Sequence, residues 1–204
     1  VAGEQQRVEL AGQLDWREAL QGEAALSWQE FPWWRLYPQP EQPPVVLRTL
    51  TAQLQYDAGN YLGHFDAALS GPAGDFTLKS PVSGDMERVH LPQLQLQAGQ
   101  GEATGNLAIG FADGVDWRTS LELRDVDPSY WLAELPGQLG GTLNSQGALR
   151  GKQLEASVVL AMDGRLRGQP TRLRLEASGR DARWGLPSVS LQLGDNRIQG
   201  SGQW

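Results

Sequence analysis

The chain contains no cysteine and only two histidines, which removes the usual residues of several chemistries. Without cysteine there is no disulfide framework, no thiol nucleophile and no thiolate metal site. His64 and His90 lie far apart in the sequence, so they give only a weak zinc signal. Aspartates gather between residues 113 and 127, but they lack the spacing of a calcium-binding loop. We therefore expect no metal and no cofactor, and we place these aspartates in solvated turns and at a helix start.

Long apolar runs, basic charge and catalytic motifs are missing as well. No stretch approaches the ~20 apolar residues that cross a bilayer as a helix. The net charge of −7 argues against nucleic acid, whose phosphates need a basic surface. The glycines at 137–141 are not followed by the Lys-Ser/Thr pair of a phosphate-binding loop, and no Gly-x-Ser-x-Gly elbow is present. The sequence therefore predicts no catalytic residues and no enzyme.

The chain is rich in alternation of apolar and polar residues with a period of two. In the segment 154–162 every even-numbered position is apolar, and similar segments recur along the chain. Successive side chains of a strand point to opposite faces, so this pattern predicts a sheet with one apolar and one polar face. Short turn signals such as the segment 57–60 (DAGN) separate the apolar segments. Tight turns favour antiparallel pairing of consecutive strands.

A nine-residue segment returns without a gap 95 residues later. The residues 91–99 (LPQLQLQAG) align with 186–194 (LPSVSLQLG), and the triplet Asp-Trp-Arg at 15–17 returns at 116–118. Repeats with a fixed period are typical of arrays built from stacked units. We predict one repeat-built segment of about two units, roughly 1–105 and 106–204, that belongs to the interior of a longer protein.

Two stretches interrupt the alternation, and each follows one copy of the Asp-Trp-Arg triplet. Residues 28–44 are rich in tryptophan and end in a Pro/Gln run, which predicts an extended loop. From Asp127 the sequence DPSYWLAELPG has an N-cap residue, a proline at the first helical position and a Pro-Gly stop. This arrangement predicts one short helix near 128–135. We expect the tryptophans of both stretches to fill core space beneath loops.

A sheet with one apolar face must close, stack against a second sheet or fold lengthwise into a trough. Repetition favours an elongated object, so we predict an all-β fold: an elongated antiparallel sheet curled into a U-shaped groove. About 14 strands spaced by ~4.8 Å give a length near 65 Å, and strands of about 5 to 6 residues give a width of roughly 17 to 20 Å. The candidate lining residues are Leu94, Leu96, Leu107, Ile109, Phe111, Leu121, Leu123, Leu154, Ala156, Val158, Leu160, Met162, Leu173, Leu175, Val189, Leu191 and Leu193.

Glycine- and leucine-rich patterns carry a resemblance to a known family. The run 135–149 (LPGQLGGTLNSQGAL) and the strand-plus-turn segment 189–202 (VSLQLGDNRIQGSG) resemble repeats of the TamB family, within the AsmA-like group. The resemblance covers most of the chain and is clearest over residues 128–202. It implies a β-taco, which is a long U-shaped sheet with a hydrophobic interior that bridges the two membranes of Gram-negative bacteria.

The resemblance also implies a function. It implies a periplasmic location in a protein anchored in the inner membrane by a segment outside this chain. It further implies phospholipid transfer to the outer membrane, partnership with the outer-membrane protein TamA, and a role in outer-membrane assembly. The inward residues supply no polar selectivity, and each buried methylene of an acyl chain contributes ~0.8 kcal/mol. The first hypothesis is therefore a lipid-conducting groove, and the family has no catalytic residues to carry over.

Two other hypotheses stay open. The chain could be a scaffold or holdase that pairs strands of unfolded outer-membrane proteins with an open sheet edge. Exposed end strands could also pair two copies of the chain into a dimer. The third hypothesis is a closed β-sandwich, either an adhesin or a carbohydrate-binding module. Exposure of Trp33, Trp34 and Trp131 on a flat face would favour the sandwich, whereas a lengthwise opening along the apolar face would favour the groove.

Overall fold

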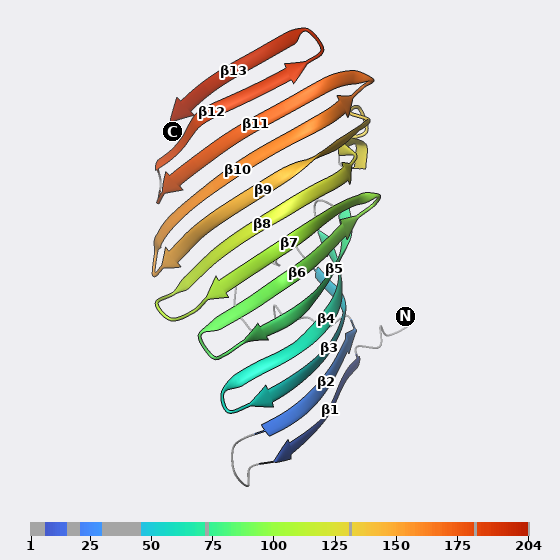
Figure 1. Ribbon diagram of the computed structural model, residues 1–204, viewed down its shortest axis with the longest axis vertical. Helices are drawn as coiled ribbons and strands as arrows, with labels where there is room; N and C mark the ends of the chain where they lie inside the picture. The colour runs from blue at the N-terminus through green and yellow to red at the C-terminus, as the bar shows by residue number, and fades with distance from the viewer. Residues whose placement is uncertain are drawn as a thin grey trace, which may run out of the picture.

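The computed structural model describes residues 7–15, 21–29, 46–71, 74–130, 132–181 and 183–203. These residues form a 13-stranded antiparallel sheet in which each strand pairs with its neighbours in the sequence, in the order β1 to β13. Figure 1 shows the strands stacked in chain order along the long axis of the molecule. The sheet stays open, because β1 and β13 do not pair with each other. The spacing of ~4.8 Å between strands gives it a length of about 58 Å.

The strands are longer than the sequence led us to expect, with 14 residues in β9 and β10 and 8 in β13. An average strand length underestimates them because each strand runs from one long edge of the sheet to the other, and several strands continue through a bulge. The strands are β1 (Arg7–Asp15), β2 (Gln21–Gln29), β3 (Val46–Asp57), β4 (Asn60–Gly71), β5 (Gly74–Gly84), β6 (Arg88–Ala98), β7 (Gly101–Gly110), β8 (Val115–Val126), β9 (Gly137–Arg150), β10 (Gln153–Leu166), β11 (Gln169–Arg180), β12 (Arg183–Leu193) and β13 (Asn196–Gln203).

Irregular pairing recurs at the repeated Leu-Pro motif. The register between β6 and β7 shifts between Leu91 and Leu94, and the register between β12 and β13 shifts between Leu186 and Val189. A proline follows the leucine in both places. Because proline has no N–H for the ladder, the pairing skips it, and the resulting bulge bends the strand. The sequence repeat therefore corresponds to the same local structure six strands apart, while the division into two units stays a prediction.

The short helix predicted near 128–135 is a single 3-10 turn, η2 (Pro128–Tyr130). The carboxylate of Asp127 accepts hydrogen bonds from the backbone N–H groups of Ser129 at 2.9 Å and of Gly137 at 3.1 Å. A hydrogen bond from the Ser129 hydroxyl, followed by these two N–H groups, lowers the pKa of Asp127. Asp127 is therefore a charged carboxylate that caps the turn, and it also accepts a hydrogen bond from Gly137, the first residue of β9.

The apolar face of the sheet lies on the inside of the curl. Val82, Leu91 and Leu94 form the most buried cluster, on β5 and β6. Half-buried apolar side chains from strands as far away as β3 and β8 pack against it: Leu54, Tyr61, Phe65, Leu78, Val89, Leu107 and Leu121. Strands two apart lie ~10 Å from each other in a flat sheet, so curvature toward this face brings such side chains together. The prediction of a curled all-β groove is confirmed.

Some sequence predictions concern residues outside the described ranges. Residues 28 and 29 belong to β2, and the other residues of the tryptophan-rich stretch 28–44 lie outside the described part of the chain. Trp33, Trp34 and Trp131, whose exposure would favour the sandwich, lie outside it too. Within the described ranges all strands belong to one sheet.

Candidate functional site

The register of the sheet builds an unbroken apolar row from β3 to β13. The row takes a single residue from each of these strands: Leu50, Ala67, Leu78, Leu96, Ala103, Leu123, Gly141, Met162, Leu173, Leu191 and Ile198. Residues directly opposite on adjacent antiparallel strands have Cβ atoms ~4.5–5.5 Å apart. No polar residue interrupts the row. The site is therefore a continuous surface that runs along the long axis of the sheet.

The predicted lining residues fall on this face with one exception. A second row runs parallel to the first through Leu94, Gly105, Leu121, Leu143, Leu160, Leu175 and Val189. The other predicted residues within strands occupy alternate positions of the same strands and so share the face. The exception is Phe111, which follows the last residue of β7 and is 47% exposed. The contact of these residues with a lipid stays a prediction.

The apolar face is not sealed by a second layer. Among the described residues no large side chain is completely enclosed, and even the most buried apolar side chain, Leu139, keeps 5% of its surface exposed. Leu160 and its cross-strand partners Leu143 and Leu175 are only half-buried. Leucines at the centre of a two-layer core would be covered on both sides. The curl thus leaves an apolar surface that another molecule can reach.

Glycines permit close approach of the strands where the sheet bends. A Cβ at position 141 would lie 1.8 Å from the carbonyl oxygen of Ala161 on β10. A Cβ at position 105 would lie 1.9 Å from the carbonyl oxygen of Ser120 on β8. No side chain fits at either place, so a glycine in the strand allows the bend. The Leu-x-Gly spacing of the segment 135–149 was the signal in the sequence that could have identified such positions.

The opposite face of the sheet carries exposed ion pairs. Asp163 on β10 binds Arg174 at 3.0 Å and Arg172 at 3.2 Å, both on β11. The hydrogen bond from Arg174 contributes most to lowering the pKa of Asp163, and the contact with Arg172 lowers it further. This carboxylate therefore stays charged. Glu155 binds Arg180 at 2.8 Å on the same pair of strands. Exposed pairs contribute little to stability, but they identify this face as the one that meets water.

A tyrosine connects η2 to the start of β5 and to the turn after β6, which lie at the same strand ends as η2. The hydroxyl of Tyr130 donates to the carbonyl of Asp75 at 2.8 Å and accepts from the N–H of Asp75 at 3.1 Å. Its ring fills the space beside Gly74 and Gly99, where a Cβ would come within 2.6 and 2.9 Å of ring atoms. Both glycines have positive φ, +91° and +61°. Sequence reasoning missed this contact because its partners lie 55 residues apart.

The geometry defines a surface rather than a reaction centre. Within the described ranges, no three His, Asp or Glu side chains lie close enough together to hold a metal ion. No helix there is both long and apolar enough to cross a membrane. By fold and site, the molecule belongs to the class of open, curled antiparallel β-sheets that carry a lengthwise apolar groove.

Comparison with known proteins specifies the family within this class. A family model described as "TamB, N-terminal domain" matches residues 2–204. The chain therefore belongs to the TamB family, which confirms the resemblance noted in the sequence. The "Translocation and assembly module subunit TamB" of Haemophilus influenzae is 23% identical over 167 residues, which cover 78% of this chain and 13% of that protein. The chain thus spans a small part of the length of this curated relative. No solved structure matches the chain.

Proposed function

We propose that this chain is a segment of a lipid conduit whose groove holds the acyl chains of phospholipids as they pass between the inner and outer membranes. The observation that carries the proposal is the apolar row from β3 to β13 on a face that no second layer of described residues covers. Apolar surface left in water costs about 25 cal/mol per Å². An acyl chain lying along the row relieves that cost and gains ~0.8 kcal/mol for each methylene that it buries.

The setting of the proposed function follows the family. The relative is named as a subunit of a translocation and assembly module. In our proposal this segment acts in the periplasm of a Gram-negative bacterium and is tied to the inner membrane by a part outside this chain. Its partner there is the outer-membrane protein TamA, and its product is a supply of phospholipid for outer-membrane assembly. The segment works without a catalytic residue, because the groove only has to hold and release acyl chains.

Adjacent residues of β10 give a matched test of the lipid path. Leu160 points to the apolar face, and Val159 points to the polar face and is 46% exposed. A photo-cross-linking amino acid at position 160 of the full-length protein should capture phospholipid in cells. The same amino acid at position 159 should capture little, because acyl chains have no reason to lie on the charged face. Capture of protein without phospholipid at position 160 would contradict the proposal.

A second candidate function is a scaffold for outer-membrane proteins, in which an unfolded strand adds to the edge of the sheet. Strand β13 pairs only with β12 among the described strands, and its Ile198 is 65% exposed. In that mechanism backbone pairing matters more than the groove lining. Charged substitutions on the apolar face would leave assembly activity intact, whereas a proline in the edge strand would abolish it. The same edge could pair two copies of an isolated segment into a dimer.

A further inference from the structure

The polar face of the sheet is hollowed over strands β6 to β11, next to the turns that join β7 to β8 and β9 to β10. The hollow has a volume of about 910 Å³. Asp116 and Arg118 line it, and they flank Trp117 in β8. Trp117 shares the apolar face with Leu121 and Leu123, at alternate positions of the same strand. Successive side chains of a strand point to opposite faces, so the hollow opens on the side of the sheet away from the groove.

Positive charge is concentrated in this hollow. Its charged lining consists of four arginines and two carboxylates: Arg88, Arg118, Arg150, Arg180, Asp116 and Glu155. Arg180 is paired with Glu155 at 2.8 Å. The guanidinium groups of the other three arginines form no ion pair with any residue that the structure describes. The hollow thus carries an excess of positive charge in a chain whose net charge is −7.

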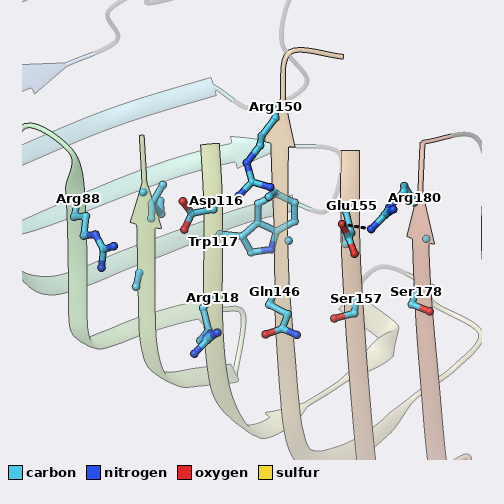
Figure 2. A pocket seen from close by; sticks show the side chains of 17 residues that line it. Arg88, Asp116, Trp117, Arg118, Gln146, Arg150, Glu155, Ser157, Ser178 and Arg180 are labelled. Carbon is cyan, nitrogen blue, oxygen red and sulfur yellow. Dashed lines mark hydrogen bonds and ion pairs between the residues drawn. The ribbon is translucent and has the colours of Figure 1, made fainter. Parts of the chain in front are cut away.

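Neutral hydrogen-bonding groups cross the floor of the hollow. Direct cross-strand pairing places four polar side chains in one line on β8 to β11 (Figure 2): Arg118, Gln146, Ser157 and Ser178. The side chains of the last three make no hydrogen bond with any residue that the structure describes. Nearer to the turns, the small residue Ala148 lies between Asp116 and Glu155. The floor therefore has unused hydrogen-bonding groups and room for a chain that crosses the strands.

The hollow is long enough for several residues of an extended chain. From β6 to β11 it crosses five strand spacings, or roughly 24 Å at ~4.8 Å each. An extended chain rises ~3.3 Å per residue, so about seven residues fit across it. Arg88 lies on β6 and Arg180 on β11, so guanidinium groups are present from one end of the hollow to the other. A single small anion would leave most of this space empty.

We propose that the hollow binds an acidic, extended segment of a partner protein on the face opposite the groove. Guanidinium groups bind carboxylates through paired, charge-assisted hydrogen bonds. The acidic side chains of the segment therefore lie against Arg88, Arg118 and Arg150, and its backbone lies over the line of neutral groups from Gln146 to Ser178. The site is independent of the proposed lipid function, because the sheet separates the hollow from the groove.

The two carboxylates of the hollow favour a polypeptide over a uniform polyanion. Asp116 lies among the arginines, and Glu155 binds Arg180. Both carboxylates repel a polyphosphate or a layer of anionic lipid headgroups, in which every unit is negative. A polypeptide also carries neutral backbone N–H groups, and a carboxylate oxygen accepts hydrogen bonds from these groups. The occupant that fits the lining therefore combines acidic side chains with neutral hydrogen-bond donors.

A cross-linking peptide tests the site in the full-length protein. The probe is a peptide of about eight residues, enough to span the hollow, in which glutamate and serine alternate and a central residue carries a benzophenone. The control peptide has glutamine in place of each glutamate. Mass spectrometry should find the acidic probe attached around Gln146 and Ser157, and little of the control peptide there. Label confined to other parts of the protein, or equal label from both peptides, overturns the proposal and leaves the proposed lipid function standing.

Arginine variants test the charge contacts by fluorescence anisotropy of the labelled acidic peptide. The triple variant Arg88→Gln, Arg118→Gln and Arg150→Gln should bind it about tenfold or more weakly, because three exposed contacts with carboxylates, each of modest strength, are lost together. The matched control removes the same charge from exposed positions at the opposite strand ends: Arg165→Gln, Arg167→Gln and Arg197→Gln. The control variant should bind as the unmodified protein does. Equal weakening in both variants would mean that net charge alone attracts the peptide, which contradicts a site in the hollow.

Competition separates a protein segment from other anionic partners. Inorganic polyphosphate and vesicles of phosphatidylglycerol should displace the acidic peptide only weakly, because Asp116 and Glu155 repel them. Displacement by polyphosphate at a lower concentration of negative charge than the peptide itself requires would assign the hollow to a polyanion. Displacement by the vesicles at such a concentration would assign it to a membrane surface. Either result refutes the proposal of a protein segment.

Discussion

At the residue scale, the same residue type plays opposite roles at two positions of the apolar face. Gly141 and Gly200 both face the groove, on β9 and β13. A Cβ at 141 would overlap the backbone of Ala161, whereas a Cβ at 200 would meet nothing within 4 Å. Position 141 requires a glycine because β9 and β10 approach closely there, whereas position 200 has room for a side chain. The bend of the sheet therefore depends on particular glycines rather than on glycine content.

This difference gives a paired prediction. Gly141→Ala should destabilise the protein by about 2 kcal/mol or more, because β9 or β10 must move to admit the methyl group. Gly200→Ala should be neutral or slightly stabilising, because alanine restricts the unfolded chain without a clash. Urea unfolding of both variants measures the two free energies. Equal effects would mean that position 141 does not constrain the bend.

At the scale of elements, η2 acts as a brace rather than as a helix. Its single turn is too short to bury an apolar face, and none of its three residues is buried. Tyr130 instead reaches the first strand residues of β5 and the turn between β6 and β7. The connection from β8 to β9 thus holds three strands that lie before it in the chain. The contact therefore ties the β8–β9 connection to the start of β5 and to the turn between β6 and β7.

The brace predicts a graded loss of order at β5. Tyr130→Phe should cost about 1 kcal/mol, because it removes the hydrogen bonds with the backbone of Asp75. Tyr130→Ala should cost more, because the ring contacts with Gly74 and Gly99 are lost as well. Hydrogen exchange of the Asp75 amide should accelerate in the same order. Tyr56→Phe is the matched control, since no described residue bonds the Tyr56 hydroxyl. An unchanged hydrogen-exchange rate of the Asp75 amide in the alanine variant would show that Tyr130 does not stabilise the start of β5.

At the scale of the whole molecule, the open apolar face distinguishes a conduit from a packed core. In a sealed sandwich, Leu160→Asp would bury an unpaired charge at a cost of roughly 3 kcal/mol or more. On a half-buried face the charge keeps contact with water, so the variant should cost clearly less and still block lipid movement. Val159→Asp on the polar face should preserve both. Thermal unfolding and lipid cross-linking measure the two effects, and complete loss of folding by Leu160→Asp would contradict an open groove.

Much of the fold could be predicted from the sequence, because alternation is a local property. The segment around Leu160 shows its apolar side directly, and Asp127 with the proline after it marks the start of η2. The contact of Tyr130 with Asp75 could not be predicted, because nothing in either segment indicates the other. The strand lengths were underestimated for a related reason. A bulge or a glycine bend lets a strand continue where the alternation is interrupted, and only the paired strand reveals this.

The sequence by itself determined which side of each strand is apolar, since the period of two assigns every side chain to a face. It also determined the order of the strands, because tight turns bring consecutive strands together. Only the tertiary structure decided that the apolar sides join into one row that runs from β3 to β13. It alone decided that Tyr56, Tyr61, Trp117 and Trp184, which come from distant segments, lie in one row across the strands. Register is a relation between strands, and a shift of one residue would turn a strand's apolar side to the opposite face, so no single segment contains that information.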